Sequence, residues 1–137
     1  MRGGSRIAVL YLWFQAAAVA AWWVLLLALP GFRARFVFAG CGDDALLAFA
    51  GADLALVACG SIAVAHGLAR ERQWALYAFS LVLGATCYAT LYCVGAAWLT
   101  DSGGLGTALM LLCTAANAVA YHLARRHRRA RKAGAIA

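Results

Sequence analysis

The chain has 137 residues, of which 66% are hydrophobic and 12% are charged, and its formal net charge is +7. With a mean hydropathy of +0.80, it has too few polar side chains to cover a water-exposed surface, which argues against a soluble globular fold. We therefore expect a single all-α domain that is surrounded by lipid.

The first predicted element is a membrane-spanning helix over residues 7–29, which Pro30 and Gly31 end. Arg2 and Arg6 precede this apolar run, as they would in a secretory signal peptide. The run is longer than the apolar core of a usual signal peptide, and no small-residue cleavage site follows it. We interpret it as the first of several membrane spans.

Three further apolar runs cover residues 45–66, 74–98 and 105–124, separated by the polar breaks GLARERQ and LTDSGG. Each reaches the length of about 20 residues that a helix needs to cross a bilayer. The runs lack the shorter alternating pattern of a membrane β-barrel. The sequence thus predicts an up-down bundle of four transmembrane helices over residues 1–124, followed by a basic tail over residues 125–137.

Positive charges predict how this bundle is oriented. With four spans, ten of the twelve Lys and Arg residues fall on the side of the two termini. Because Lys and Arg near the ends of spans stay in the cytoplasm, we expect both termini to be cytoplasmic, in a bacterial inner membrane or a comparable membrane. Arg33 and Arg35 lie in the long first loop, where the segment FRARFVF suits a free loop or the headgroup region.

Asp53 lies about 12 Å inside the second predicted span, counted at about 1.5 Å per residue from Ala45. An ionised carboxylate at such a depth costs at least roughly 2.5 to 3.5 kcal/mol, so it needs hydrogen-bond donors, protonation or access to water. No basic residue lies at that depth in the four runs. Hydroxyl groups of the third span, from Tyr88, Thr90 and Tyr92, are the donors that we expect near its level.

Two interpretations of Asp53 are open. It is either a polar contact that joins two helices, worth about 0.6 kcal/mol on average, or a functional group. The functional alternatives are a proton or cation site and a carboxyl that holds the polar end of a ligand. Ser, Thr or Asn would serve as well for a helix contact, which favours the functional interpretation.

Gln15 in the first span and Asn117 in the fourth form a second polar layer, each about eight residues from the cytoplasmic ends. Hydrogen bonding between helices explains this layer on its own. Alternatively, the layers around Asp53 and around Gln15 and Asn117 line a narrow polar path, or a pocket for an amphipathic molecule.

His66 and His122 end the second and fourth spans at matching depth. Imidazoles on facing helices can hold haem or a metal ion, but a histidine at a helix end beside arginines is more typical of a solvated interface. The five cysteines show no C-x-x-C spacing and are interpreted as small packing residues. We expect no cofactor and no metal.

The basic tail resembles a phosphate-binding segment, but it lacks interleaved aromatic residues and adjoins a membrane span. We therefore expect it to bind anionic lipid headgroups and not nucleic acid. Its basic residues are Arg125, Arg126, Arg128, Arg129, Arg131 and Lys132.

Three classes of function remain compatible with the sequence. The first is a transporter, channel or ligand-binding bundle centred on Asp53, which we expect to form a homo-oligomer. The second is an accessory or structural subunit of a larger membrane complex. The third is a membrane-embedded enzyme, which is ranked last because the chain has no nucleotide-binding loop, no Ser-His-Asp pattern and no H-E-x-x-H motif.

Overall fold

The protein was analysed as a computed structural model that describes residues 3–134, and every regular element in this range is helical. Four continuous helical segments are long and apolar enough to cross a membrane, at Arg6–Ala28, Asp43–Ala69, Ala75–Thr100 and Gly104–Ala130. The prediction of an all-α protein with four spans is confirmed. The elements are α1 (Gly3–Ala28), α2 (Pro30–Arg33), α3 (Asp43–Ala52), η1 (Asp53–Cys59), α4 (Gly60–Ala69), α5 (Ala75–Thr100) and α6 (Gly104–Gly134).

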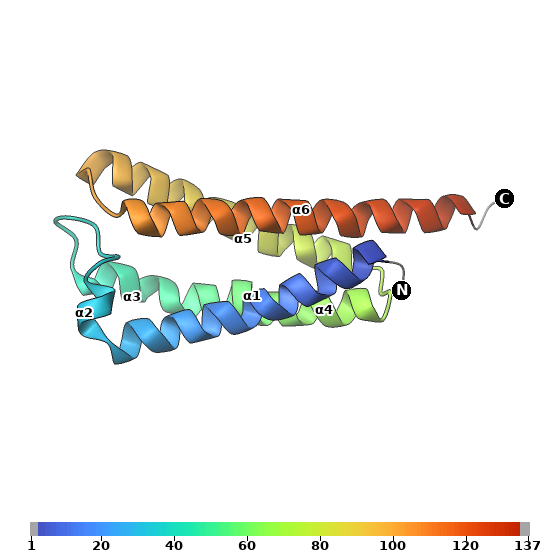
Figure 1. Ribbon diagram of the computed structural model, residues 1–137, viewed down its shortest axis with the longest axis horizontal. Coiled ribbons are helices and arrows are strands. Elements are labelled where there is room, and N and C mark those ends of the chain that lie inside the picture. Colours follow the sequence, from blue (N-terminus) through green and yellow to red (C-terminus); the bar gives the residue numbers. More distant parts are fainter. Residues whose placement is uncertain (1–2, 135–137) are drawn as a thin grey trace.

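The four spans run alternately up and down, so both termini lie at one end of the bundle, here called the terminal end. The opposite end, called the loop end, carries α2, the first loop and the turn from α5 to α6 (Figure 1). At the terminal end α6 extends beyond the other helices, and residues predicted as a basic tail continue it as a helix to Gly134.

Large apolar side chains cover the outside of the bundle. Tyr77 and Leu81 are each 76% exposed, and Trp98 is 87% exposed. Such a surface is unfavourable in water over this area and suits contact with hydrocarbon. The packing therefore agrees with the lipid environment that the composition predicts.

The connections at the loop end follow from residues with restricted or unusual backbone angles. Pro30 limits the residue before it to extended conformations, and Leu29 (φ −125°, ψ 86°) ends α1 there. Between α5 and α6 the chain turns through Asp101 (φ 48°) and Gly103 (φ 73°). A Cβ atom on Gly103 would lie 2.3 Å from the ring of Phe38, so glycine serves both the backbone angle and the close contact with the first loop.

The second span is not one regular α-helix. Its middle third, η1 (Asp53–Cys59), is a π-helix, and Asp53 is its first residue. Hydrogen bonds from residue i to i+5 widen the turns and change the direction of side chains beyond the segment, and such segments are frequent at functional sites. The sequence pattern predicts a continuous α-helix here and does not reveal this change.

The terminal half of the bundle is tightly packed. Its core cluster joins all four spans and contains Leu12, Val64 and Phe79, each fully buried. Glycines bring α4 and α5 close together, because a Cβ atom on Gly60 would lie 2.9 Å from Val82, and one on Gly67 would lie 2.9 Å from Ala75 and Trp74.

Threonines join α5 to α6 along the pair. The hydroxyl of Thr90 donates to the carbonyl oxygen of Met110 (3.1 Å) and lies 2.7 Å from the hydroxyl of Thr114. Thr114 donates to the carbonyl oxygen of Thr86 (3.1 Å), and Thr107 to that of Cys93 (3.2 Å). Because lipid offers no competing hydrogen bonds, these contacts help to fix the register of the two helices.

The first loop folds back over the bundle instead of extending away from it. Phe36 is buried against Trp23 and Leu26 of α1, and the backbone N–H of Ala39 donates to Ser102 Oγ at 2.7 Å. An ion pair between Arg33 and Asp43 links α2 to the start of α3. The segment predicted as a free loop or a headgroup segment therefore covers the loop end of the bundle.

Candidate functional site

The loop-end half of the bundle encloses a cavity of about 610 Å³. Its walls come from α1, α3, η1, α5 and α6, and residues 36–38 of the first loop cover it. The tightly packed core lies in the other half of the bundle, the terminal half. A volume of roughly 300 to 1,000 Å³ is typical of pockets for small organic ligands.

The cavity has an opening between α1 and α6. Phe14 of α1 and Leu112 of α6 both line it, yet they are 71% and 68% exposed. Residues with these two properties mark a rim. Because both side chains are apolar and belong to membrane spans, the opening faces the hydrocarbon of the bilayer.

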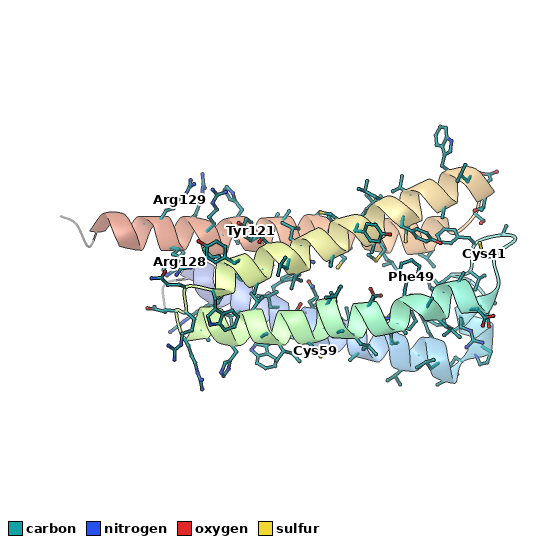
Figure 2. All side chains as sticks on the ribbon, turned by 180° about the vertical axis from the view of Figure 1, so that it is seen from behind. Cys41, Phe49, Cys59, Tyr121, Arg128 and Arg129 are labelled. Atoms are coloured by element: carbon teal, nitrogen blue, oxygen red, sulfur yellow. The ribbon has the colours of Figure 1, made fainter. Side chains whose placement is uncertain are left out.

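Aromatic side chains make up much of the lining. Trp22 packs edge to face against Phe36 with ring centroids 4.6 Å apart, and Phe49 of α3 lies 4.9 Å from Tyr92 of α5. Figure 2 shows Phe49 at the level where α3 faces α5. The aromatic residues that line the cavity are Tyr11, Phe14, Trp22, Trp23, Phe36, Phe38, Phe49 and Tyr92.

Asp53 provides the carboxyl group of the cavity. It lies ten residues after Asp43, the first residue of α3, which corresponds to a depth of about 15 Å at about 1.5 Å per residue. Trp23 Nε1 donates a hydrogen bond to Asp53 Oδ2 at 3.2 Å, and Asp53 is partly buried. No other described residue bonds its side chain, and none of the described lining residues is Lys, Arg, His or Glu.

Gln15 supplies a second polar group to the same cavity. Its side chain is 4% exposed, and its Nε2 donates to Ser61 Oγ at 3.1 Å. The side-chain oxygen Oε1 accepts no hydrogen bond from the described part of the chain. A buried carbonyl oxygen without a donor is unfavourable by about 1 to 3 kcal/mol. Gln15 Oε1 is such an oxygen among the described residues.

Asn117 lies at the base of this region, fully buried and outside the cavity lining. Its Nδ2 donates to the carbonyl oxygen of Cys113 at 3.2 Å, and its Oδ1 has no partner among residues 3–134. Cys113 also accepts a hydrogen bond from the hydroxyl of Tyr11 at 3.3 Å. Gln15 and Asn117 thus bond different partners, and no hydrogen bond joins them.

Of the three third-span residues expected near Asp53, the structure brings Tyr92 into the same cavity. Thr90 directs its hydroxyl to α6 instead. Tyr88 is 70% exposed on the outer face and does not line the cavity. Thr90 lies on a different face of α5 from the two tyrosines, which are four residues apart and share one face; of these, Tyr92, nearer the loop end, is the one that lines the cavity.

Trp23 and Ser61 are the polar partners that the sequence interpretation missed. Trp23 is eight residues after Gln15, which places both on nearly the same face of α1 and was a usable signal. Trp22 and Trp23 both line the cavity. Ser61 follows η1, where the α-helical register no longer predicts side-chain directions.

The histidines and the basic residues lie away from this site. His66 and His122 are both exposed, and residues 3–134 contain no group of three side chains suited to hold a metal ion.

Arg128 and Arg129 lie at the terminal end, opposite Cys41 (Figure 2), and Arg128 donates to the carbonyl oxygen of Gln73 at 2.8 Å. Arg125, Arg126 and Arg129 are exposed on α6, and the side chains of Arg131 and Lys132 fall outside the described ones.

Fold and site together define a small polytopic membrane protein with four helical spans and a lipid-facing cavity. Comparisons with protein-family models, with curated proteins and with solved structures found no match. The cavity is therefore the feature of the molecule that bears on function.

Proposed function

We propose that the protein binds a small amphipathic molecule in this cavity, with Asp53 holding its polar end. The observation that carries the proposal is an apolar cavity of about 610 Å³, open between α1 and α6, with one carboxyl group in its lining. A cleft lined mainly by apolar and aromatic side chains with a few polar groups is typical of sites for small organic ligands. The cavity therefore favours a ligand site over a simple contact between helices.

The shape of the cavity favours a ligand that arrives through the membrane. One rim lies between α1 and α6 in the apolar region, and a second rim, at the loop end, is marked by the exposed lining residues Cys41, Gly42 and Ala45. An amphipathic molecule dissolved in the bilayer can reach the opening between α1 and α6 without crossing water. The cavity is complete within one chain, so binding itself needs no second copy, and assembly into a homo-oligomer or a larger complex stays a separate prediction.

Transport is the extension of this proposal that the bundle permits. The ligand would then leave through the terminal half, where the core around Leu12 and Phe79 must separate. The distribution of Lys and Arg favours cytoplasmic termini, and a bacterial inner membrane stays a separate prediction. In that orientation the described state is closed toward the cytoplasm.

The test is to fill the cavity and to measure binding. Ala89 of α5 lines the cavity, whereas Leu91 on the same helix is 71% exposed. We expect Ala89→Trp to abolish binding of an uncharged amphipathic fluorophore, N-phenyl-1-naphthylamine, to the detergent-purified full chain. Leu91→Trp is the matched control and should bind as the wild type does.

Equal binding by wild type and Ala89→Trp, with both monodisperse, would contradict the proposal. It would show that the fluorophore associates with the outer surface alone. The alternative of an accessory subunit, whose polar residues serve only as contacts, would then be the better interpretation.

A further inference from the structure

We propose that the occupant of the cavity is a lipophilic amine, whose ammonium group pairs with Asp53 and whose apolar body extends toward Gln15. This inference depends on the proposed binding function and adds the chemical class of the ligand. It follows from the charges, the free acceptor, the aromatic walls and the distance between the two polar groups.

The charge of the lining favours a cation. Asp53 is the one carboxyl group among the described lining residues, and no Lys, Arg or His accompanies it there. Arg33, at the loop end, is paired with Asp43. In a low-dielectric cavity a carboxylate without a basic partner attracts a positive charge and opposes a negative one.

Asp53 keeps a free acceptor in the cavity. The indole N–H of Trp23 donates to one oxygen of its carboxyl group, and no other described residue bonds that group. A ligand with an N–H donor would satisfy the second carboxyl oxygen, whereas a ligand made of acceptors would leave it without a donor.

Aromatic rings stand next to the carboxyl group. Phe49 precedes Asp53 by four residues, hence by about one helical turn, and its ring lies 4.9 Å from that of Tyr92. Trp23 contacts the carboxyl directly. Aromatic side chains in the lining are compatible with an ammonium ligand, since aromatic rings attract a desolvated cation.

The spacing of the two polar groups sets the length of the ligand. Gln15 and Trp23 are separated by eight residues of α1, which is about 12 Å along the helix axis. One ammonium group cannot contact both Asp53 and Gln15 across such a separation. Because Asp53 and Gln15 both line the cavity, it takes an elongated ligand, with the ammonium group at Asp53 and an apolar body that reaches toward Gln15.

A bare metal ion fits the site poorly. Metal ions that prefer oxygen ligands take about six to eight of them at close range. The described residues contain no group of three candidate ligands, and Asp53 is the one carboxyl group among the lining residues that the structure describes. An organic cation, which needs one charged partner and apolar walls, agrees better with this lining.

The experiment compares three fluorescent probes that share a dansylamide and an octyl chain and differ only in a terminal ammonium, hydroxyl or carboxylate group. Binding to the purified full chain in a nonionic detergent is followed by dansyl fluorescence. We expect the ammonium probe to bind about ten to a hundred times more tightly than the hydroxyl probe. The carboxylate probe should bind least.

The variant Asp53→Asn should reduce the affinity for the ammonium probe to that for the hydroxyl probe, while the affinity for the hydroxyl probe stays nearly unchanged. Asp44→Asn is the matched control, because Asp44 belongs to the same span but is exposed and outside the cavity lining. The comparison of probes uses the wild-type chain, so it decides the question even if Asp53→Asn fails to assemble.

Equal affinities for the ammonium and hydroxyl probes, or preference for the carboxylate, would overturn the amine assignment. If Ala89→Trp still blocked all three probes, the binding function itself would stand. If Ala89→Trp blocked none of them, the cavity would not be the binding site, and both proposals would fail.

Discussion

Trp23 of the first span donates its indole N–H to the carboxyl group of Asp53 in the second span, over 3.2 Å. Trp23 is 2% exposed and belongs to the cluster with Leu26 and Phe36 that lies under the first loop. The carboxyl is thus held by a rigid, buried donor, and its other oxygen has no protein partner in the described chain. This arrangement fixes where Asp53 meets the cavity and leaves it one free acceptor.

Trp23→Phe should remove this donor while keeping most of the ring volume. We expect the free energy of unfolding to fall by about 1 kcal/mol, because hydrogen bonds between membrane helices contribute roughly 0.6 to 1.7 kcal/mol. Unfolding in mixed micelles of dodecyl maltoside and dodecyl sulfate measures the change. Trp13→Phe is the control, because Trp13 is 47% exposed and does not line the cavity. An equal fall in the free energy of unfolding of Trp13→Phe would contradict the role given to the Trp23 hydrogen bond.

The pair of Gln15 and Ser61 tests whether the polar lining serves stability. In Gln15→Leu with Ser61→Ala, both partners of the 3.1 Å hydrogen bond are removed together with the unpartnered oxygen. We expect the double variant to be as stable as the wild type or more stable, since replacing both partners of a buried bond by apolar groups is nearly neutral. Ser61→Ala alone should lose about 1 kcal/mol or more, because it leaves the Gln15 amide without its acceptor.

Mixed-micelle unfolding of the wild type, the single variant and the double variant checks this prediction. A double variant that is less stable than Ser61→Ala would mean that Gln15 is kept as a contact between helices. Its free oxygen would then give no support to a ligand.

Much of the fold could be predicted from the sequence, because span length and apolar composition alone define four helices in lipid. Asp53 was identifiable because a carboxyl is costly at its depth. The π-helix η1 was not, since residue patterns at 3.6 residues per turn carry no sign of an i to i+5 segment. For the same reason Ser61, just beyond η1, was not predicted as the partner of Gln15.

The fold of the first loop was also beyond the sequence pattern. Its alternating aromatic and basic residues suggested a position at the headgroups, but the close fit of Phe38 against Gly103 depends on a turn about sixty-five residues further along the chain. Contacts of this kind depend on how the helix pairs are arranged, which a single sequence does not show. The cavity lies between these pairs and was inferable only as a possible pocket.

Thr90 should contribute more to stability than Thr86, although both are buried on α5. Thr90 bonds two groups of α6, whereas the hydroxyl of Thr86 donates within its own helix to Leu83. We expect Thr90→Val to lower the free energy of unfolding by about 1 kcal/mol and Thr86→Val to change it by only a few tenths. Mixed-micelle unfolding measures both, and the reverse order would contradict the role of threonines in joining α5 to α6.

Two glycines should respond oppositely to substitution by alanine. A Cβ atom on Gly67 would lie 2.9 Å from Ala75 and from the ring of Trp74, whereas one on Gly84 would meet nothing within 4 Å. We expect Gly67→Ala to destabilise the protein by about 1 to 3 kcal/mol through overpacking. Gly84→Ala should be neutral or stabilising by up to about 1 kcal/mol, because alanine favours a helix. Thermal unfolding in detergent compares them, and equal effects would contradict the close crossing of α4 and α5.

Cys41 provides a natural reporter of orientation. It is exposed in the first loop, at the end opposite Arg128 and Arg129 (Figure 2), whereas the other cysteines lie within the spans. Because Lys and Arg concentrate on the side of the termini, we expect the first loop to face away from the cytoplasm. A membrane-impermeant maleimide added to intact bacterial spheroplasts that express the chain should therefore label it without permeabilisation.

Cys41→Ser should remove this labelling, which would assign the labelled site to the first loop. Labelling of Cys41 that requires permeabilised membranes would place the loop inside and the termini outside, and would reverse the direction in which the cavity is closed.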